Sequence, residues 1–402
     1  MLGNSFPKLR ARIRASLLLP VVTGMWLAGA ARAQLNPPIA GATNAARAAK
    51  PWGELKIQRI PLEKSDFVFL DRAMRLKTPA WHFENFSPPQ LVSFLESCNL
   101  SPSVHDDLLQ TNRWIALSNA CDISPSHDLI LKLNPAERAR LFAVLGRSET
   151  NYAQRWPFRM PLNGFDERFA CANLPKAKLE LVRSLTYTNG NQLCFCNFGT
   201  LKAFVTDDEF NEIVEALYAV PAVLVRVHVT PDSDVNALVK YWGRGGREQR
   251  IRPLIESVAH MPAGEDLNVS FLLPQFARVR LYVFPDPDGD VTEAKTDCFY
   301  TAFNFFSAKA DDRFLDPQVR RQTLQNEYAP IRGQPLLGDL VTLINRKGNI
   351  FHVAVYIAQD IVFTKNGENY LQPWVLMRMD DLLAFYGTEV PVRMIIYRRK
   401  DL

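Results

Sequence analysis

Two side chains in the C-terminal part of the chain could act together as a nucleophile and a base. Cys298 directly follows Asp297, and His352 lies 54 residues further on, in the run Phe351-His-Val-Ala-Val-Tyr-Ile357. A thiol that gives its proton to an imidazole can attack a carbonyl carbon, and the imidazole can then protonate the leaving group. These residue types in this order therefore indicate acyl-transfer chemistry.

The segment 297–306 has the pattern of a helix that carries Cys298 in its first turn. Asp297 is the expected N-cap, and an apolar stripe follows at Phe299, Ala302, Phe303 and Phe306. At a helix N-terminus the dipole and the free backbone N–H groups favour a thiolate and could hold an oxyanion. A cysteine in a buried helix is more often a core residue, so Cys298 needs a partner before it indicates catalysis.

His352 is expected on a strand, with Ala354 and Tyr356 on its own face and Val353 and Val355 on the other. A single histidine in this position is most often a satisfied core residue, and the preceding cysteine changes that interpretation. Further strands are predicted at 339–345, 361–364, 374–379 and 392–398, and short turns between them favour antiparallel pairing. A cysteine-bearing helix on an antiparallel sheet gives an α+β fold.

These motifs resemble those of the NlpC-type cell-wall peptidases and the related CHAP amidases, which are papain-like. The resemblance rests on Asp297-Cys298 opening a helix, then Gly338-Asp-Leu-Val, then His352-Val-Ala-Val-Tyr-Ile. It implies that Cys298 is the nucleophile, that His352 is the general base, and that a polar residue from the next strand orients the imidazole. We expect Asn366 in that third role, with Asn369 and Thr364 as alternatives.

The resemblance also implies the substrate, an amide bond in peptidoglycan stem peptides, and so predicts an exported cysteine peptidase or amidase. It departs from the family after the cysteine, where Phe299-Tyr300 replaces Ser-Gly, and upstream, where the aromatic and Gly-Gly signature is missing. The rival hypothesis is therefore an inactive papain-like scaffold or binding protein of the cell envelope. Two other arrangements are less favoured: a transglutaminase-like enzyme using Asp360, and a permuted papain fold using His260.

Residues 1–33 have the features of a secretory signal peptide. Four cationic residues precede an apolar run at 15–30, and Ala31-Arg-Ala33 matches a signal-peptidase site. We therefore predict a periplasmic or extracellular protein. Residues 34–50, rich in Ala, Asn and Pro, are predicted to form a flexible tether. No other run is long and apolar enough for a membrane span, so none is expected after cleavage.

Charge and cysteine spacing exclude two further classes of function. The formal charge is +5, but five cationic side chains lie in the first 33 residues, so the remainder is close to neutral. Nucleic-acid binding depends on neutralising phosphates, so no nucleic-acid partner is expected. Cys194 and Cys196 form a C-x-C pair without a second Cys/His pair at zinc-site spacing, so no metal or cofactor is predicted.

We expect two globular domains, an α+β domain of unknown function at 51–278 and a papain-like domain at 279–402. In the first, helices should begin after Ser87, Asn134 and Thr206, and a strand should cover 223–229. The alternation of Val279, Leu281 and Val283 predicts another strand. The arginines at 244, 247, 250 and 252 indicate either a binding site for an anionic ligand or a solvated loop and helix face.

Overall fold

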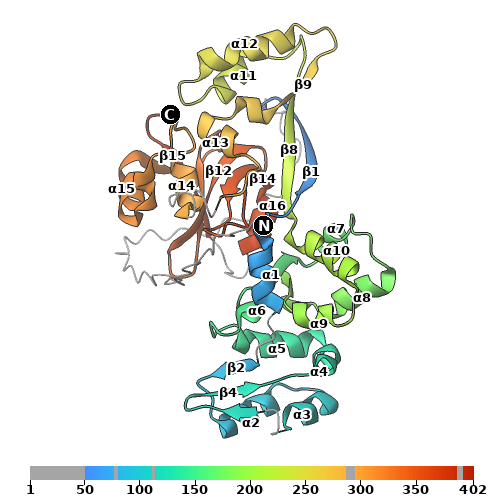
Figure 1. Ribbon diagram of the computed structural model, residues 1–402. Helices are drawn as coiled ribbons and strands as arrows, with labels where there is room; N and C mark the ends of the chain where they lie inside the picture. Colours follow the sequence, from blue (N-terminus) through green and yellow to red (C-terminus); the bar gives the residue numbers. More distant parts are fainter. Residues whose placement is uncertain (1–49, 77–79, 111–113, 287–294, 387–392) are drawn as a thin grey trace, which may run out of the picture. The chain divides into compact units, whose positions relative to one another are not determined.

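The computed structural model describes residues 50–402, apart from 77–79, 111–113, 287–294 and 387–392 (Figure 1). The predicted signal peptide and most of the predicted tether lie outside the described residues. Ala46–Leu402 forms one compact unit. One hydrophobic core contains Trp242 and Leu267 together with Phe305 and Phe363, so packing is continuous across residue 278. The domain boundary placed there stays a prediction.

A six-stranded antiparallel sheet carries the C-terminal part of the chain. Its strand order is β10-β15-β11-β12-β13-β14. The strands are β10 (Tyr328–Ile331), β11 (Leu340–Ile344), β12 (Ile350–Ala358), β13 (Ile361–Lys365), β14 (Trp374–Arg378) and β15 (Arg393–Arg399). Every predicted strand from 339 onward is present, and β10 was not predicted. Because β15 pairs with both β10 and β11, the sheet is not a simple meander.

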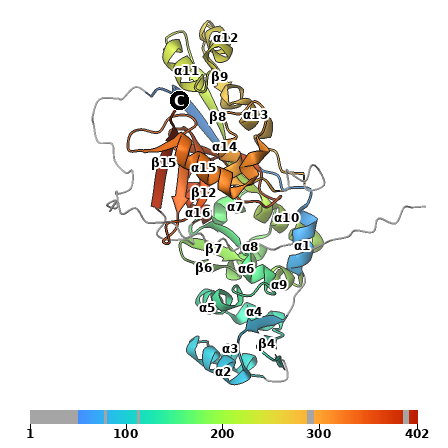
Figure 2. The same ribbon diagram turned by 90° about the vertical axis from the view of Figure 1, so that its left-hand side faces the viewer.

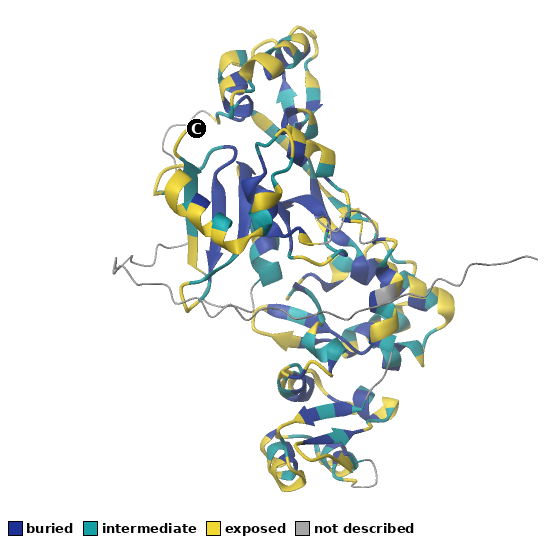
Figure 3. Ribbon diagram, turned by 60° about the vertical axis from the view of Figure 1, so that its left-hand side comes forward, coloured by how far each residue is buried: buried dark blue, intermediate teal, exposed yellow. Residues whose placement is uncertain are grey.

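The two faces of this sheet bury different side chains, as the alternation in β12 predicts. Val353, Val355 and Ile357 belong to one core cluster, which also holds Ala302 and Phe303 of α14 (Cys298–Phe303). Ala354 and Tyr356 belong to a second cluster. The central strands are buried along nearly their whole length (Figure 3). Helix α14 therefore packs on the face that carries the odd-numbered residues of β12.

Three smaller antiparallel sheets and a set of helices make up the rest, so the predicted α+β class is confirmed (Figure 2). The sheets are β1-β8-β9, β2-β4-β3 and β5-β7-β6. Their strands are β1 (Glu54–Leu62), β2 (Trp81–Glu84), β3 (Trp114–Ala116), β4 (Ala120–Ile123), β5 (Phe158–Pro161), β6 (Tyr187–Asn189), β7 (Gln192–Phe195), β8 (Val220–Val229) and β9 (Glu265–Asn268). Apart from α2, α5 and α10, described below, the helices before β8 are α1 (Val68–Leu76), α3 (Pro102–Leu108), α4 (His127–Lys132), α6 (Tyr152–Arg155), α7 (Phe165–Arg168), α8 (Lys176–Ser184) and α9 (Phe198–Lys202). Those after β8 are α11 (Val235–Trp242), α12 (Glu248–Ala259), α15 (Pro317–Glu327) and α16 (Met379–Tyr386).

Three helix starts follow the capping signals in the sequence. α2 (Pro88–Ser97), α5 (Pro135–Leu145) and α10 (Asp207–Tyr218) each begin with a capping box, in which the N-cap and N3 residues satisfy each other's backbone groups. The strand predicted at 223–229 is confirmed as part of β8.

The strand predicted around Leu281 is wrong. Pro274 precedes a helix, α13 (Gln275–Arg280), and Leu281 makes only an isolated bridge to Trp374. Val279 and Val283 are 57% and 48% exposed, so their alternation with Leu281 does not mark a buried face. Apolar alternation over so few residues does not distinguish a strand from the end of a helix.

The Gly338-Asp339 pair has a packing role in this chain. Gly338 has φ +88°, and a Cβ there would lie 2.2 Å from the Phe306 ring, so only glycine fits. The buried Asp339 carboxylate accepts from Arg244 Nη1 at 3.1 Å and from Arg398 Nη2 at 2.6 Å. Asp339 therefore ties the arginine-rich loop before α12 to the large sheet.

The four arginines divide into two pairs: Arg250 and Arg252 lie on a solvated face of α12, whereas Arg244 and Arg247 are half-buried. Arg244 also donates to the Leu337 carbonyl, and Arg247 donates to the carbonyls of Trp242 and Leu272. Burial lowers the pKa of Arg247 to about 10. These two arginines hold neighbouring loops in place.

Candidate active site

Cys298 opens helix α14, which packs over strands β12 and β13. Their pairing ends at Val355 and Phe363. In the same register Val353 would face Lys365, and burial raises the pKa of the Cys298 thiol while the Val353 backbone opposes that shift. Helix α14 contacts both strands. The structure therefore places the helix that Cys298 opens against the strand that carries His352.

Asp297 fixes the start of α14, as predicted. Its Oδ1 accepts from the Tyr300 backbone N–H at 2.8 Å, and its Oδ2 accepts from Arg320 Nη1 at 2.6 Å. The helix is shorter than predicted, because Asn304 ends it as the C-cap. Cys298 therefore opens a six-residue helix that is held by an ion pair to α15.

The His352 imidazole is fully buried, and among the described residues only one of its nitrogens has a partner. Nε2 lies 3.0 Å from Thr364 Oγ1, on β13. Nδ1 is buried and has no hydrogen-bond partner among the described residues. His352 shares the face of β12 that carries Ala354 and Tyr356, whereas α14 packs on the opposite face, and no hydrogen bond links Cys298 and His352 in this part of the chain.

Thr364 occupies the position next to the imidazole for which Asn366 was predicted. Thr364 Oγ1 donates to Asn366 Oδ1 at 3.5 Å, and Asn366 Nδ2 lies 3.6 Å from the Met377 sulfur. If the hydroxyl proton points to Asn366, the Thr364 oxygen accepts from Nε2–H, and Nδ1 is left as the basic nitrogen. Asn366 then acts on His352 through Thr364. Asn369 instead accepts from the Leu371 N–H.

Burial keeps both reactive groups neutral. Cys298 is 4% exposed and His352 is 0% exposed. Burial, followed by the Asp297 charge, raises the pKa of Cys298 to about 12. Burial alone lowers the pKa of His352 to about 3. The expected lowering of the thiol pKa at a helix N-terminus is therefore outweighed in this closed arrangement.

Lys365 is a buried cation near Cys298 that was not predicted from the sequence. Its side chain is 0% exposed, and Nζ donates to the carbonyls of Gly367 at 2.7 Å and Asn369 at 3.3 Å. Burial lowers the pKa of Lys365 to about 8, and the charges of Asp297 and Cys298 oppose that shift. The Lys365 charge in turn lowers the pKa of Cys298. The sequence does contain a signal for this residue, because Lys365 ends the apolar strand that begins at Ile361.

Tyr386 of α16 covers the imidazole. The rings of His352 and Tyr386 stack with their centroids 4.2 Å apart and their planes at 29°. Burial, and then the charges of Cys298 and Asp297, raise the pKa of Tyr386 well above its ordinary value. Tyr386 therefore belongs to the same buried cluster, although α16 was not predicted.

The other candidate residues lie elsewhere. Asp360 accepts from Arg378 at 2.6 Å, and His260 is an exposed C-cap of α12. All six cysteines are free, and only Cys171 is exposed. Within the described ranges no group of His, Cys, Asp and Glu is arranged to hold a metal ion. No helix in those ranges combines the length and apolarity that crossing a membrane requires.

Comparison with known proteins adds no relative. The chain matches no protein-family model, no curated protein and no solved structure.

Proposed function

We propose that the chain is a cysteine hydrolase that cleaves an amide bond through an acyl-enzyme, with Cys298 as nucleophile and His352 as base. The observation that carries the proposal is that Tyr386 neighbours both groups: its ring stacks on the His352 imidazole at 4.2 Å, and the charge of Cys298 adds to burial in raising the pKa of Tyr386. The Nε2 of His352 is engaged by Thr364, and its Nδ1 has no partner among the described residues.

The chemistry assigns one role to each nitrogen. Nδ1 takes the thiol proton, the sulfur attacks the amide carbonyl, and the C–N bond breaks as the imidazolium protonates the leaving amine. Water then adds to the thioester, with the imidazole as base, and the thiol is restored. Thr364 keeps the proton on Nε2, so that Nδ1 is the acceptor.

The substrate class, peptidoglycan stem peptides, rests on the resemblance of the Cys298, Gly338-Asp339 and His352 motifs to the NlpC-type peptidases. An exported protein would meet this substrate in the cell envelope. The test is digestion of purified muropeptides by the wild type, by Cys298→Ala and by Cys171→Ala, which removes the exposed thiol. We expect products from the wild type and Cys171→Ala only. Equal product profiles from the wild type and Cys298→Ala would remove the hydrolase proposal.

A second candidate is an inactive scaffold or binding protein of the cell envelope. Complete burial of the imidazole, its stacking on Tyr386 and the neutral thiol favour this reading. The two candidates differ in the need for the thiol. A scaffold would keep its envelope function in the Cys298→Ala variant, whereas a hydrolase would lose it.

A further inference from the structure

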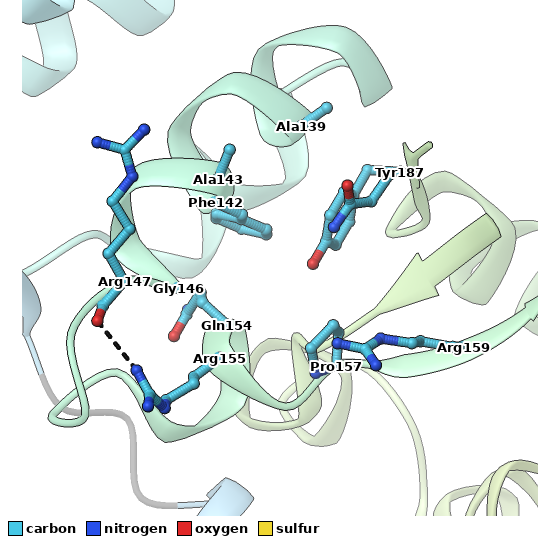
Figure 4. A pocket seen from close by; sticks show the side chains of 11 residues that line it. Ala139, Phe142, Ala143, Gly146, Arg147, Gln154, Arg155, Pro157, Arg159 and Tyr187 are labelled. Carbon is cyan, nitrogen blue, oxygen red and sulfur yellow. Dashed lines mark hydrogen bonds between the residues drawn. The ribbon is translucent and has the colours of Figure 1, made fainter. Parts of the chain in front are cut away.

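A cavity far along the sequence from Cys298 is lined by three arginines. It has a volume of about 200 Å³ and lies among α5, α6, β5 and β6 (Figure 4). Arg147, Arg155 and Arg159 line it, and none of its lining residues is acidic. Phe142 and Tyr187 contribute aromatic surface to it. The cavity therefore combines positive charge with an apolar wall.

Arg159 is half-buried and lines this cavity. Its Nε, like those of Arg138 and Arg280, is buried without a hydrogen-bond partner, and no ion pair to Arg159 is present among the described residues. Arg155 differs, because it donates to the Arg147 carbonyl at 3.0 Å and approaches Glu149 at 3.5 Å. A buried N–H group without an acceptor costs about 1–3 kcal/mol, so such groups usually have a partner.

In a neighbouring cavity, the lining arginine is paired with acceptors of the protein itself. Arg75 lines a cavity of about 310 Å³, but its guanidinium donates to Asp71 at 2.6 Å and to the Trp156 carbonyl at 2.6 Å. Asp71 also accepts from the hydroxyls of Tyr152 and Tyr218. Arg75 is thus neutralised by the protein, whereas nothing comparable faces Arg159.

We propose that the smaller cavity binds a small oxyanion, a carboxylate or a phosphate ester, with Arg159 as its main contact. A guanidinium matches the planar arrangement of two oxygens in either group, and a charge-assisted hydrogen bond is stronger than a neutral one. Arg147 and Arg155 add to the positive potential. Phe142, Ala139 and Ala143 offer contact to a short apolar group that the anion carries. This proposal does not depend on chemistry at Cys298.

The experiment is isothermal titration of the full chain with N-acetylalanine, phenyl phosphate and the uncharged N-acetylalanine amide. We expect at least one anion to bind and the amide not to bind. Arg159→Gln should weaken binding about tenfold or more, since it removes the charged donor. Arg140→Gln is the matched control, because Arg140 is on the same helix α5, does not line the cavity and donates to the Asn99 carbonyl. Preference between the two anions identifies the source of the oxyanion.

A wild-type measurement keeps the test valid if Arg159→Gln does not fold. Phenylglyoxal modifies accessible arginines, and peptide mass spectrometry reports the modification at Arg159. The bound anion should slow that modification and leave modification of Arg140 unchanged. Absence of binding by both anions, equal binding of the amide, or equal loss in Arg159→Gln and Arg140→Gln would overturn the proposal.

Discussion

Thr364 Oγ1 lies 3.0 Å from His352 Nε2, and this contact joins the neighbouring strands β12 and β13. Thr364 also donates to Asn366, so its oxygen is free to accept the Nε2 proton. With the Thr364 proton directed to Asn366, this contact fits the tautomer that the proposed mechanism needs, in which Nδ1 is basic. The third polar residue next to the imidazole is a threonine, and the asparagine predicted for that role lies one hydrogen bond further away.

Thr364→Val tests this relationship with little change in volume. Loss of the hydroxyl removes the acceptor for Nε2–H, so we expect hydrolysis of muropeptides to fall about tenfold to a hundredfold. Asn366→Ala should lower it less, because Asn366 acts through Thr364. Rates at several substrate concentrations would check both variants. A greater loss in Asn366→Ala than in Thr364→Val would contradict the assigned order of contacts.

The buried histidine should make stability depend on pH. Burial lowers the pKa of His352 from 6.5 to about 3 in the folded chain. Between these values the unfolded chain binds more protons, so stability falls as the pH falls below about 6.5. A shift of this size corresponds to about 2 kcal/mol lost between pH 7 and pH 5.

Urea unfolding of the wild type and of His352→Gln at pH 7 and pH 5 measures this effect. The variant should lose less stability between the two pH values than the wild type. His260→Gln changes an exposed histidine and should leave the pH dependence as it is. Equal pH dependence in the wild type and His352→Gln would show that His352 is not buried as a neutral group.

The local parts of the site were predictable, and the parts that depend on strand separation were not. Asp297 before Cys298, and the alternation around His352, are short-range patterns that determine a helix start and a strand face. The positions of Lys365 and Tyr386 follow from where β12 parts from β13 and from how α16 packs, and both depend on pairing across the chain. The strand predicted from Val279 and Leu281 is absent for a related reason. Their alternation is a local pattern, and no neighbouring strand pairs with it to form a sheet.

Asp339 should be a major source of stability. Its carboxylate is 1% exposed and accepts from Arg244, from Arg398 and from the Leu336 N–H at 2.8 Å. Asp339→Asn removes the charge but keeps the shape, and it leaves two guanidinium groups without an anion. Breaking a buried pair in this way costs about 3–5 kcal/mol.

Asp401→Asn is the matched control for that substitution. Asp401 pairs with Arg399 at 2.6 Å, but its side chain is 66% exposed, so the expected loss is at most about 1 kcal/mol. Urea unfolding at neutral pH gives both values. A loss in Asp339→Asn no larger than that in Asp401→Asn would mean that the arginine-rich loop is held to the sheet by apolar contacts alone.

Lys365 should control the reactivity of Cys298 over a defined pH range. The Lys365 charge lowers the pKa of the buried thiol, and burial lowers the pKa of Lys365 itself to about 8. The ammonium therefore supports a thiolate below about pH 8 and loses that effect as the pH rises above it. Lys365→Met should slow alkylation of Cys298 by iodoacetamide about threefold to tenfold near neutral pH, because one pKa unit changes the thiolate fraction tenfold.

Mass spectrometry of the peptide that contains Cys298 separates this signal from that of Cys171, the exposed cysteine. Lys347→Met removes an exposed lysine and should not alter the rate. The difference between the wild type and Lys365→Met should shrink above pH 9, where Lys365 is mostly uncharged in the wild type. A constant difference at every pH would indicate that Lys365 acts only through its hydrogen bonds to the Gly367 and Asn369 carbonyls. Equal alkylation rates in the wild type and Lys365→Met at every pH would mean that the Lys365 charge has no effect on the Cys298 thiol.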